Sequence, residues 1–320
     1  MTQNPELRTP IKILIIDEMH PSLFQMLENI GIEVDYQPDI KPAEVRGVLQ
    51  DFDGLIVRSK MRIIAETLEL AERLQFVARA GAGVDNIDDP ALQSRGIALL
   101  AANEGNSQAV GEFTLGLLLA LLRNTVRAAG QVQNKVWLRE ENRGEEVSSK
   151  TIGIIGFGNM GQSFARVLRG FGCRVIAYDR FAPEKITAPV ACVSLEELQA
   201  EADVVSLHIP YIPENLGFAS DDFFQGFNKP VWFLNTSRGD VVDEAALVHH
   251  LQNGSIKGAA LDVLENEKLL TLTALQQEHF KYLAAAENVL LTPHIAGWTH
   301  ESYIKINEVL VAKIRQLLHV

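Results

Sequence analysis

Four polar segments in the second half of the chain hold the residues best suited to chemistry: residues 208–210, 235–239, 262–267 and 292–298. They contain an arginine, several carboxylates and two histidines, and each interrupts or ends an apolar run. In an open α/β sheet, ligands bind at the carboxyl ends of the strands, where each of these segments would fall. An arginine, a carboxylate and a histidine that converge there can bind an anion and move a proton.

A glycine-rich turn precedes these segments. Residues 156–161 read Gly-Phe-Gly-Asn-Met-Gly, directly after the apolar run 151–155 and at the start of a helix with apolar periodicity. The first glycine permits the tight turn, the second lets the backbone approach a pyrophosphate, and the third lets the helix pack close to the sheet. The helix N-terminus offers free N–H groups to the phosphates. The residues expected to hold a dinucleotide here are Gly156, Gly158, Asn159, Met160 and Gly161.

The next expected strand ends at Asp179, about twenty residues beyond the glycines, as in dinucleotide-binding folds. A carboxylate at this place can accept hydrogen bonds from the ribose hydroxyls of adenosine, and it would repel a 2′-phosphate. The sequence therefore predicts NAD as the cofactor in preference to NADP. Arg180 follows immediately and can soften this preference.

Two sets of short apolar runs would position these residues. In the first set the expected strands are Ile11–Ile16, Ile32–Tyr36, Gly54–Val57, Leu74–Ala78 and Ile97–Ala101. In the second set they are Thr151–Ile155, Arg174–Tyr178, Asp203–Leu207, Val231–Leu234, Gly258–Leu261 and Val289–Leu291. Near-continuous apolar runs are typical of strands buried on both faces of a parallel sheet between helices. The fold class is therefore α/β, with two doubly wound parallel-sheet domains.

Three longer segments are predicted to be helical. Ser107–Asn124 is apolar nearly all round, so we expect it to be buried between layers or at an interface. Met160–Phe171 follows the glycine turn. Glu301–Leu318 has apolar residues at helical spacing, which predicts an amphipathic closing helix packed against another element.

Composition narrows the class of protein. A chain of 320 residues exceeds the size of about 250–300 residues at which one core stops growing, which favours two domains. The net charge of −12 argues against a broad surface for nucleic acid or for anionic membranes. Cys173 and Cys192 form no disulfide framework and no metal-ligand spacing, so we expect a reducing compartment and no metal.

No segment of the sequence has the properties of a membrane span or a leader. The longest apolar run, Leu115–Leu122, is far shorter than the roughly 20 residues that cross a bilayer. The first ten residues are polar and lack the apolar core of a signal peptide, so we interpret them as a frayed lead-in to the first strand. We therefore expect a cytoplasmic protein.

The order of the polar segments, with residues 79–88 (RAGAGVDNID) upstream, resembles the D-isomer-specific 2-hydroxyacid dehydrogenases, and within them the phosphoglycerate dehydrogenases. The resemblance runs from about residue 54 to the C-terminus. It implies a catalytic triad of Arg238, Glu267 and His294. The family's spacing after Asp262 selects Glu267 over Glu265 as the carboxylate.

The chemistry of the three side chains suits that assignment. Oxidation of a 2-hydroxy acid requires removal of the hydroxyl proton as a hydride leaves C2 for the nicotinamide, and His294 would be the base. Glu267 would orient the imidazole and favour its protonated form, and Arg238 would bind the substrate oxygens and stabilise the developing alkoxide. The resemblance also assigns residues to the cofactor cleft: Ile209, Pro210, Thr236, Ser237, Asp262 near the nicotinamide, and Gly297. His208 we interpret as an orienting or packing residue with no catalytic role.

A basic stretch in the first half would meet an anionic substrate. Arg58, Ser59 and Lys60, followed by Arg62, come after the expected strand Gly54–Val57 and so at its carboxyl end. By resemblance, phosphoglycerate dehydrogenases carry such a segment where the substrate's phosphate binds. The resemblance also implies that the backbone of Ala82 and Gly83 takes the substrate carboxylate.

Two departures from the family pattern leave other substrates open. Lys268 replaces the usual proline after the catalytic glutamate, and residues 278–285 add length beside the catalytic face. Alternatives are a relative acting on glyoxylate, hydroxypyruvate, D-lactate or erythronate 4-phosphate. Formate dehydrogenase is disfavoured, because such relatives carry an amide where Glu267 stands. A different class is an NAD(H)-sensing corepressor-like binding protein.

The resemblance also implies an organisation of domains. An NAD-binding Rossmann domain (residues 104–292) would be inserted into a discontinuous, flavodoxin-like substrate domain (residues 1–103 and 293–320). The chain would lack the regulatory domain that some phosphoglycerate dehydrogenases append. Family members form homodimers through the NAD-binding domain, and Trp137 lies on the extension that would reach the partner.

Overall fold

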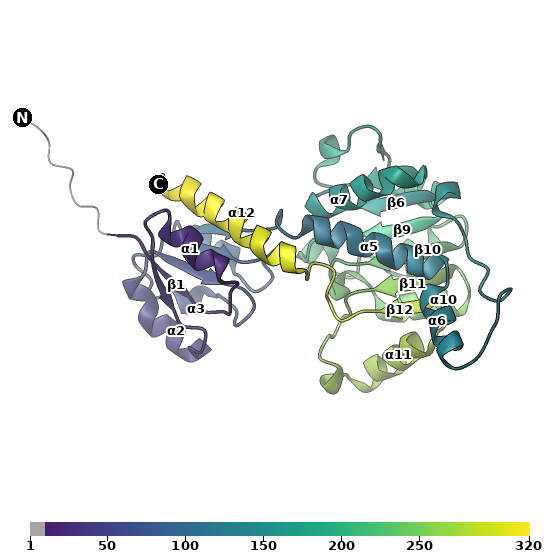
Figure 1. Cartoon of the computed structure of the whole chain (residues 1–320), viewed down its shortest axis with the longest axis horizontal. Helices are drawn as coiled ribbons and strands as arrows, with labels where there is room; N and C mark the ends of the chain where they lie inside the picture. The colour runs from purple at the N-terminus through teal and green to yellow at the C-terminus, as the bar shows by residue number, and fades with distance from the viewer. Residues whose placement is uncertain (1–9) are drawn as a thin grey trace, which may run out of the picture. The chain divides into compact units, whose positions relative to one another are not determined.

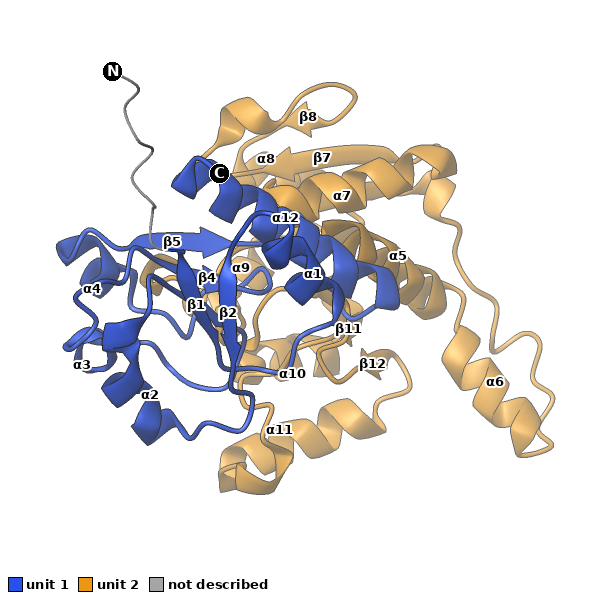
Figure 2. Ribbon diagram, turned by 60° about the vertical axis from the view of Figure 1, so that its left-hand side comes forward, with its two compact units in different colours: residues 1–106, 298–320 blue, residues 107–297 orange. Residues whose placement is uncertain are grey.

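The computed structural model describes residues 10–320 and divides the chain into two compact units. Unit 1 comprises Met1–Asn106 and Trp298–Val320, and unit 2 comprises Ser107–Gly297 (Figures 1 and 2). Of the N-terminal lead-in expected from the sequence, residues 1–9 lie outside the described residues. Unit 2 is one continuous segment inserted between the two parts of unit 1.

Unit 1 is built on a five-stranded parallel sheet of order β2-β1-β3-β4-β5. Its strands are β1 (Lys12–Ile15), β2 (Glu33–Tyr36), β3 (Gly54–Val57), β4 (Phe76–Arg79) and β5 (Ala98–Ala101). Its helices are α1 (Ser22–Glu28), α2 (Pro42–Val48), α3 (Ala65–Leu68), α4 (Asp89–Ser94) and α12 (His300–Leu318). The strand order is that of flavodoxin-like folds.

Alternation along the central strands of unit 1 sends side chains into two apolar layers. Leu14 packs into a core with residues of α2, α3 and α4 on one face of the sheet. Ile13 and Ile15 pack on the other face, against residues of α1 and α12. The edge strand β2 departs from expectation, because none of its four residues is buried. Its sequence, Glu-Val-Asp-Tyr, was wrongly grouped with the strands buried on both faces.

Unit 2 is built on a seven-stranded parallel sheet of order β12-β11-β10-β9-β6-β7-β8. Its strands are β6 (Thr151–Ile155), β7 (Arg174–Tyr178), β8 (Ala191–Cys192), β9 (Val204–Leu207), β10 (Val231–Asn235), β11 (Ile256–Leu261) and β12 (Val289–Leu291). Its helices are α5 (Ser107–Leu122), α6 (Thr125–Gln133), α7 (Asn159–Leu168), α8 (Leu195–Glu201), α9 (Asp221–Gln225), α10 (Glu244–Gln252) and α11 (Ala274–Ala285). This is the Rossmann strand order with one more strand at an edge. The expected α/β class with two parallel sheets is thus confirmed.

Helices cover both faces of the unit 2 sheet. Residues of α5 and α7 form one core with β6, and residues of α8, α9, α10 and α11 form the other. The helices α5 and α7 approach closely at Gly111, where a Cβ would lie 2.6 Å from the hydroxyl oxygen of Ser163. Short 3-10 helices connect the elements of both units, at Leu49–Asp51, Val147–Ser149, Arg169–Phe171, Pro183–Lys185, Pro213–Asn215, Gly239–Val241 and Leu269–Thr271.

The segment expected as one helix, Ser107–Asn124, is shorter and is followed by a second helix. The helix α5 ends at Leu122, and Asn124 adopts a left-handed φ of 51° before α6 begins. Helix α6 contains no buried residue, and its apolar side chains, among them Val126 and Val132, are exposed. Among the described residues no single helix is long and apolar enough to cross a membrane, although α5 and α6 taken together, with a 62° bend, have sufficient length and composition.

Candidate active site

The polar segments of unit 2 follow the strands of its sheet in spatial order. His294 comes after β12, Glu267 after β11, Arg238 after β10 and the glycine turn after β6. Because every strand in this sheet is parallel, these segments all leave the same, carboxyl edge. In the sheet β6 lies between β7 and β9, so the strand order reverses at β6. Such folds bind ligands at the carboxyl edge beside this switch point.

The glycine turn after β6 is closely packed at its first and third glycines. Gly156 has φ +88°, and a Cβ there would lie 2.6 Å from the carbonyl oxygen of His208. A Cβ on Gly161 would lie 2.1 Å from the carbonyl oxygen of Gly156. Both positions therefore exclude any side chain, which is the reason for glycine that the sequence suggests.

The second glycine of the turn faces open space. A Cβ on Gly158 would meet no atom within 4 Å, and no side chain caps the ten-residue helix α7. Among the described residues, no acceptor is found for the backbone N–H groups of Gly158, Asn159 and Met160. Three free donors at the positive end of a helix suit a pyrophosphate. The turn therefore fits the phosphates of a dinucleotide.

The carboxylate of Asp179, after β7, is held by the backbone around it. Its Oδ2 accepts from the N–H of Phe157 at 2.7 Å, and its Oδ1 accepts from the N–H groups of Phe181 and Ala182 at 2.9 and 2.8 Å. Burial would raise the pKa of Asp179, but the three N–H donors outweigh it, helped by the charge of Lys185, and the pKa lies below its ordinary value. The side chain is therefore ionised and fixed beside the glycine turn.

The structure brings His294 and Glu267 together. The imidazole Nδ1 lies 2.8 Å from Oε1 and 3.1 Å from Oε2 of the carboxylate, and both side chains are about half exposed. Glu265 points elsewhere, since its carboxylate accepts from the side-chain amide of Gln276 in α11 at 3.5 Å. His294 has a left-handed φ of 56°, which is uncommon for a residue other than glycine and marks a constrained turn.

Asp262 fixes that turn. Its buried carboxylate accepts from the hydroxyl of Thr292 at 2.6 Å and from the N–H groups of Ile295 and Ala296 at 3.0 and 2.7 Å. Its backbone carbonyl accepts from the N–H of His294 at 2.8 Å. The resemblance suggested only a place near the nicotinamide for Asp262, whereas its contacts show that it holds the backbone on both sides of His294.

Arg238 lies on a turn that is held by Asn235. The buried amide of Asn235 accepts from both the N–H and the hydroxyl of Ser237, at 3.0 and 2.7 Å, and donates to the carbonyl of Arg238 at 2.8 Å. The guanidinium of Arg238 donates to the carbonyl of Ser237 at 2.7 Å. Thr236 lies 3.0 Å from the hydroxyl of Thr114 in α5. Sequence reasoning did not single out Asn235, although a lone amide at the end of an apolar strand is the signal of such a turn.

His208, after β9, is a buried neutral histidine. Its Nε2 is hydrogen-bonded to the hydroxyl of Ser206 at 2.9 Å, and its ring packs on Phe164. Burial lowers the pKa of His208 to about 3, so the imidazole carries no charge at neutral pH. A group with that pKa is a poor general base near neutrality, which leaves His294 as the acid–base candidate at this edge. Ile209, which follows, contacts the position that a Cβ on Gly156 would occupy.

The basic stretch of unit 1 is tethered within its own unit. The N–H groups of Arg58, Ser59 and Lys60 donate to the buried carboxylate of Asp17 at 2.8, 3.2 and 3.0 Å. The ammonium of Lys60 donates to the carbonyl oxygens of Pro38 and Ile40. Lys60 is thus engaged within its own unit, although an ammonium has three donors and these two carbonyls leave one of them for a further acceptor.

Arg58 is held by aromatic side chains. Its guanidinium lies over the rings of Trp298 and Tyr303, 4.1 and 4.9 Å from their centroids, and donates to the hydroxyl of Tyr303. Arg62 is exposed, and among the described residues it has no hydrogen-bond or ion-pair partner. In the same part of the chain, the backbone N–H groups of Ala82 and Gly83 also have no acceptor. These donors of unit 1 therefore remain available for an anion.

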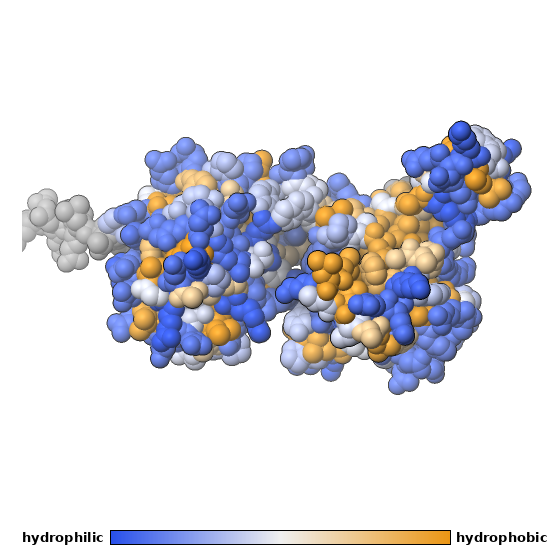
Figure 3. All heavy atoms as spheres, turned by 90° about the horizontal axis from the view of Figure 1, so that it is seen from below, coloured by the Kyte–Doolittle hydropathy of each residue, from blue (hydrophilic) through white to orange (hydrophobic). Residues whose placement is uncertain are grey.

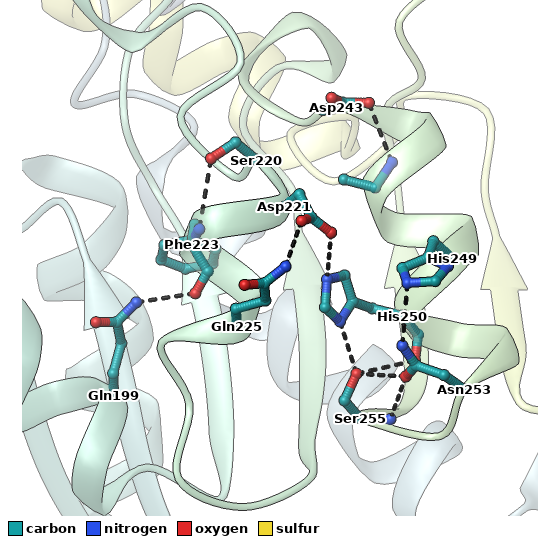
Figure 4. A network of polar contacts seen from close by, with 11 residues as sticks. Gln199, Ser220, Asp221, Phe223, Gln225, Asp243, His249, His250, Asn253 and Ser255 are labelled. Atoms are coloured by element: carbon teal, nitrogen blue, oxygen red, sulfur yellow. Dashed lines mark hydrogen bonds and ion pairs between the residues drawn. The ribbon is translucent and has the colours of Figure 1, made fainter.

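A second histidine network lies at the opposite, amino edge of the unit 2 sheet (Figure 4). His250 lies at the end of α10. Its Nε2 lies 2.9 Å from a carboxylate oxygen of Asp221 in α9, and its Nδ1 lies 2.7 Å from the hydroxyl of Ser255. The residue types are those of a hydrolytic triad, but ligands bind at the other edge of such sheets. We assign this network to packing of α9 against α10. Within residues 10–320 no group of three or more His, Cys, Asp or Glu side chains could hold a metal ion.

Comparisons with known proteins show the family to which the chain belongs. The family model described as D-isomer specific 2-hydroxyacid dehydrogenase, NAD binding domain, matches residues 115–296. D-3-phosphoglycerate dehydrogenase of Homo sapiens is 34% identical over 299 residues, which cover 93% of this chain and 54% of that protein. The chain therefore spans about half the length of that relative.

Two further relatives are matched over most of their length. Hydroxypyruvate reductase of Thermotoga maritima is 34% identical over 271 residues, 85% of this chain and 86% of that protein. The solved structure of D-lactate dehydrogenase from Aquifex aeolicus, complexed with NAD and lactic acid, is 26% identical. It superposes with a TM-score of 0.80 over 96% of this chain and 95% of that chain.

Proposed function

Because this chain belongs to the D-isomer-specific 2-hydroxyacid dehydrogenase family, we propose that it transfers a hydride between NAD(H) and a D-2-hydroxy acid. The observation that carries the proposal is the pair of His294 and Glu267, 2.8 Å apart at the sheet edge that also bears the glycine turn. The corepressor-like binding protein resembles these enzymes in fold and triad, but a relative matched over most of its length is a reductase. The enzyme is therefore the better interpretation.

In this proposal the three polar side chains divide the work. Nδ1 of His294 faces Glu267, so Nε2 is the nitrogen that takes the proton from the substrate hydroxyl during oxidation. Glu267 stabilises the imidazolium so formed, and in reduction the same nitrogen returns the proton to the carbonyl oxygen. Arg238 binds the substrate carboxylate and stabilises charge on the reacting oxygen.

Unit 2 is proposed to hold NAD, which when bound accepts or donates the hydride. The free N–H groups of the glycine turn would bind its pyrophosphate, and Asp179 would accept from the adenosine ribose hydroxyls. Asp262 acts by holding the turn of His294. The remaining residues assigned to the cofactor are Ile209, Pro210, Thr236, Ser237 and Gly297.

Unit 1 is proposed to bind the rest of the substrate. Arg58, Ser59, Lys60, Ala82 and Gly83 follow neighbouring strands, β3 and β4, and so leave the same edge of their sheet. The available N–H groups of Ala82 and Gly83 suit a carboxylate. The basic stretch suits a second anionic group, which makes 3-phosphoglycerate and 3-phosphohydroxypyruvate, at the entry to serine synthesis, the first candidates. The relative that reduces hydroxypyruvate makes the unphosphorylated acids the second.

A substrate panel tests both the activity and the role of the basic stretch. We expect NADH oxidation with 3-phosphohydroxypyruvate to exceed that with hydroxypyruvate, glyoxylate and pyruvate. Lys60→Ala should raise KM for the phosphorylated acid about tenfold, the loss of one charge-assisted hydrogen bond, and change KM for hydroxypyruvate less than twofold. Equal losses on both substrates would show that Lys60 only tethers its loop to Pro38 and Ile40. No turnover of any of the acids would refute the proposed activity.

We further propose a homodimer formed through unit 2. The segment that follows α5 exposes large apolar side chains, with Trp137 76%, Val126 57% and Val132 52% exposed, and Figure 3 shows apolar side chains gathered on one face of this unit. Exposed apolar surface of this kind marks interaction sites. Light scattering should give twice the mass of the 35.4 kDa chain, and the mass of one chain would contradict a dimer.

The enzyme is proposed to act in the cytoplasm, without nucleic-acid or membrane partners. The cysteines Cys173 and Cys192 are both free in the structure, which suits a reducing compartment. The net charge of −12 repels nucleic acids and anionic lipids. Recovery of the protein in a membrane fraction after cell lysis would contradict this.

A further inference from the structure

Glu244 is a buried carboxylate that the proposed mechanism does not use. It is the first residue of α10, 7% exposed, and its Oε1 accepts from the backbone N–H of Glu265 at 2.9 Å. Burial raises the pKa of Glu244, and the nearby charges of Glu265 and Asp240 add to the rise, against the hydrogen bond and the charge of His279. Burial of a carboxylate is costly, and here the hydrogen bond from the Glu265 N–H offsets part of that cost.

The peptide held by Glu244 is also pressed against the turn that carries Arg238. A Cβ on Gly239 would lie 1.9 Å from both the carbonyl carbon and the oxygen of Leu264, and 2.4 Å from the nitrogen of Glu265. The Leu264–Glu265 peptide therefore contacts the backbone next to Arg238 on one side. On its donor side it is bound by the carboxylate of Glu244.

This peptide links the two loops that bear the charged side chains of the site. Arg238 directly precedes Gly239, and Glu267 lies two residues beyond Glu265. We propose that Glu244 is a positioning residue, which clamps the Leu264–Glu265 peptide against Gly239 and thereby fixes Glu267 beside His294. The inference rests on the proposed function of that pair. Misplacement of a catalytic group by about 1 Å can cost about a hundredfold in rate, so one such hydrogen bond can matter.

Two uncharged variants of similar length separate the hydrogen bond from the charge. Glu244→Gln keeps an oxygen that can accept from the Glu265 N–H, whereas Glu244→Met fills the space without an acceptor. We expect kcat within about threefold of wild type for Gln and at least tenfold lower for Met, with KM for NADH within twofold in both. Equal kcat values for the two variants would overturn the proposal.

Asp203 offers a matched structural control. Its carboxylate accepts from the N–H of Thr151 at 2.8 Å, at the amino edge of the same sheet and away from the site. Asp203→Ala should lower the thermal midpoint of unfolding and leave kcat unchanged. A fall in kcat equal to that of Glu244→Met would show that any lost anchor in unit 2 slows the enzyme.

A double-mutant cycle asks whether Glu244 acts through Glu267. If it does, Glu244→Met should lower kcat less than twofold in a Glu267→Gln background, because the group that it positions is already gone. Multiplicative losses would mean that Glu244 acts independently, against the proposal.

Amide hydrogen exchange tests the clamp without any turnover. The Glu265 N–H should be protected in the wild type and in Glu244→Gln, and should exchange at least tenfold faster in Glu244→Met. If Glu244→Met exchanges faster but the wild-type protein turns over none of the acids, the clamp is supported and the proposed function is refuted. Unchanged exchange would refute the clamp even in an active enzyme.

Discussion

Removal of the His294 imidazole should lower kcat at least about a thousandfold while NADH binds as tightly as before. The loss follows because His294 is the proposed acid–base group, and His208, the other histidine of the four polar segments, is buried and neutral. Binding is spared because the glycine turn and Asp179 lie on other loops. Steady-state kinetics and fluorescence titration with NADH measure the two effects separately.

The choice of variant follows from the backbone at His294. Its φ of 56° favours asparagine over alanine, because alanine in the left-handed region costs about 1 kcal/mol of conformational free energy. His294→Asn and His294→Ala should therefore lose activity alike but differ in stability. His249→Ala, on the exposed face of α10, is the control that keeps full activity. Turnover within tenfold of wild type in either His294 variant would remove this residue as the base.

The second large effect is expected for cofactor choice. Asp179→Ala should reduce the preference for NAD over NADP about a hundredfold, through the loss of charge-assisted hydrogen bonds to the ribose and of repulsion toward a 2′-phosphate. The measurement is kcat/KM for each cofactor. An unchanged ratio would refute the assignment of this carboxylate to the ribose.

The contacts of Asp179 supply a matched variant. Asp179→Asn removes the charge but keeps an oxygen for the Phe157 N–H, so it should shift the cofactor ratio while the glycine turn keeps its stability. Because the pKa of Asp179 lies below its ordinary value of 3.8, the carboxylate stays ionised from pH 5 to 9 and the preference for NAD should be flat there. Its contribution to stability is present above that ordinary value and is lost as the pH falls through the lowered one.

Much of the fold follows from runs of apolar residues. The strands β3, β6, β7 and β12 have the predicted bounds, because each is a short, mostly apolar run bounded by turns that contain polar residues or glycine. The two-residue strand β8 and the exposed helix α6 were missed, since β8 is too short to show a period and α6 buries none of its residues. Edge and surface elements owe their structure to neighbours that the local sequence does not reveal.

The candidate site was predictable to the level of residue types at strand ends. The glycine turn could be assigned roles from its spacing, and the structure gives a steric reason for Gly156 and Gly161, whereas Gly158 faces open space. The engagement of Lys60 by two carbonyls could not be predicted, because Pro38 and Ile40 are about twenty residues away and backbone carbonyl groups leave no pattern in the sequence. The same is true of Asn235 and Glu244, whose partners are backbone N–H and carbonyl groups of turns.

The insertion of unit 2 into unit 1 sets an order of assembly on the ribosome. Residues 107–297 are continuous and complete their own sheet, whereas the face of the unit 1 sheet formed by Ile13, Ile15 and Phe76 is covered by α12, which is synthesised after unit 2. Domains usually fold in order from the N-terminus. Here the first strands to be synthesised keep one apolar face exposed until α12 has been made. Folding of unit 2 shortens the loop that α12 must close. The nascent chain is thus most exposed to aggregation, and most in need of a chaperone, in its N-terminal part.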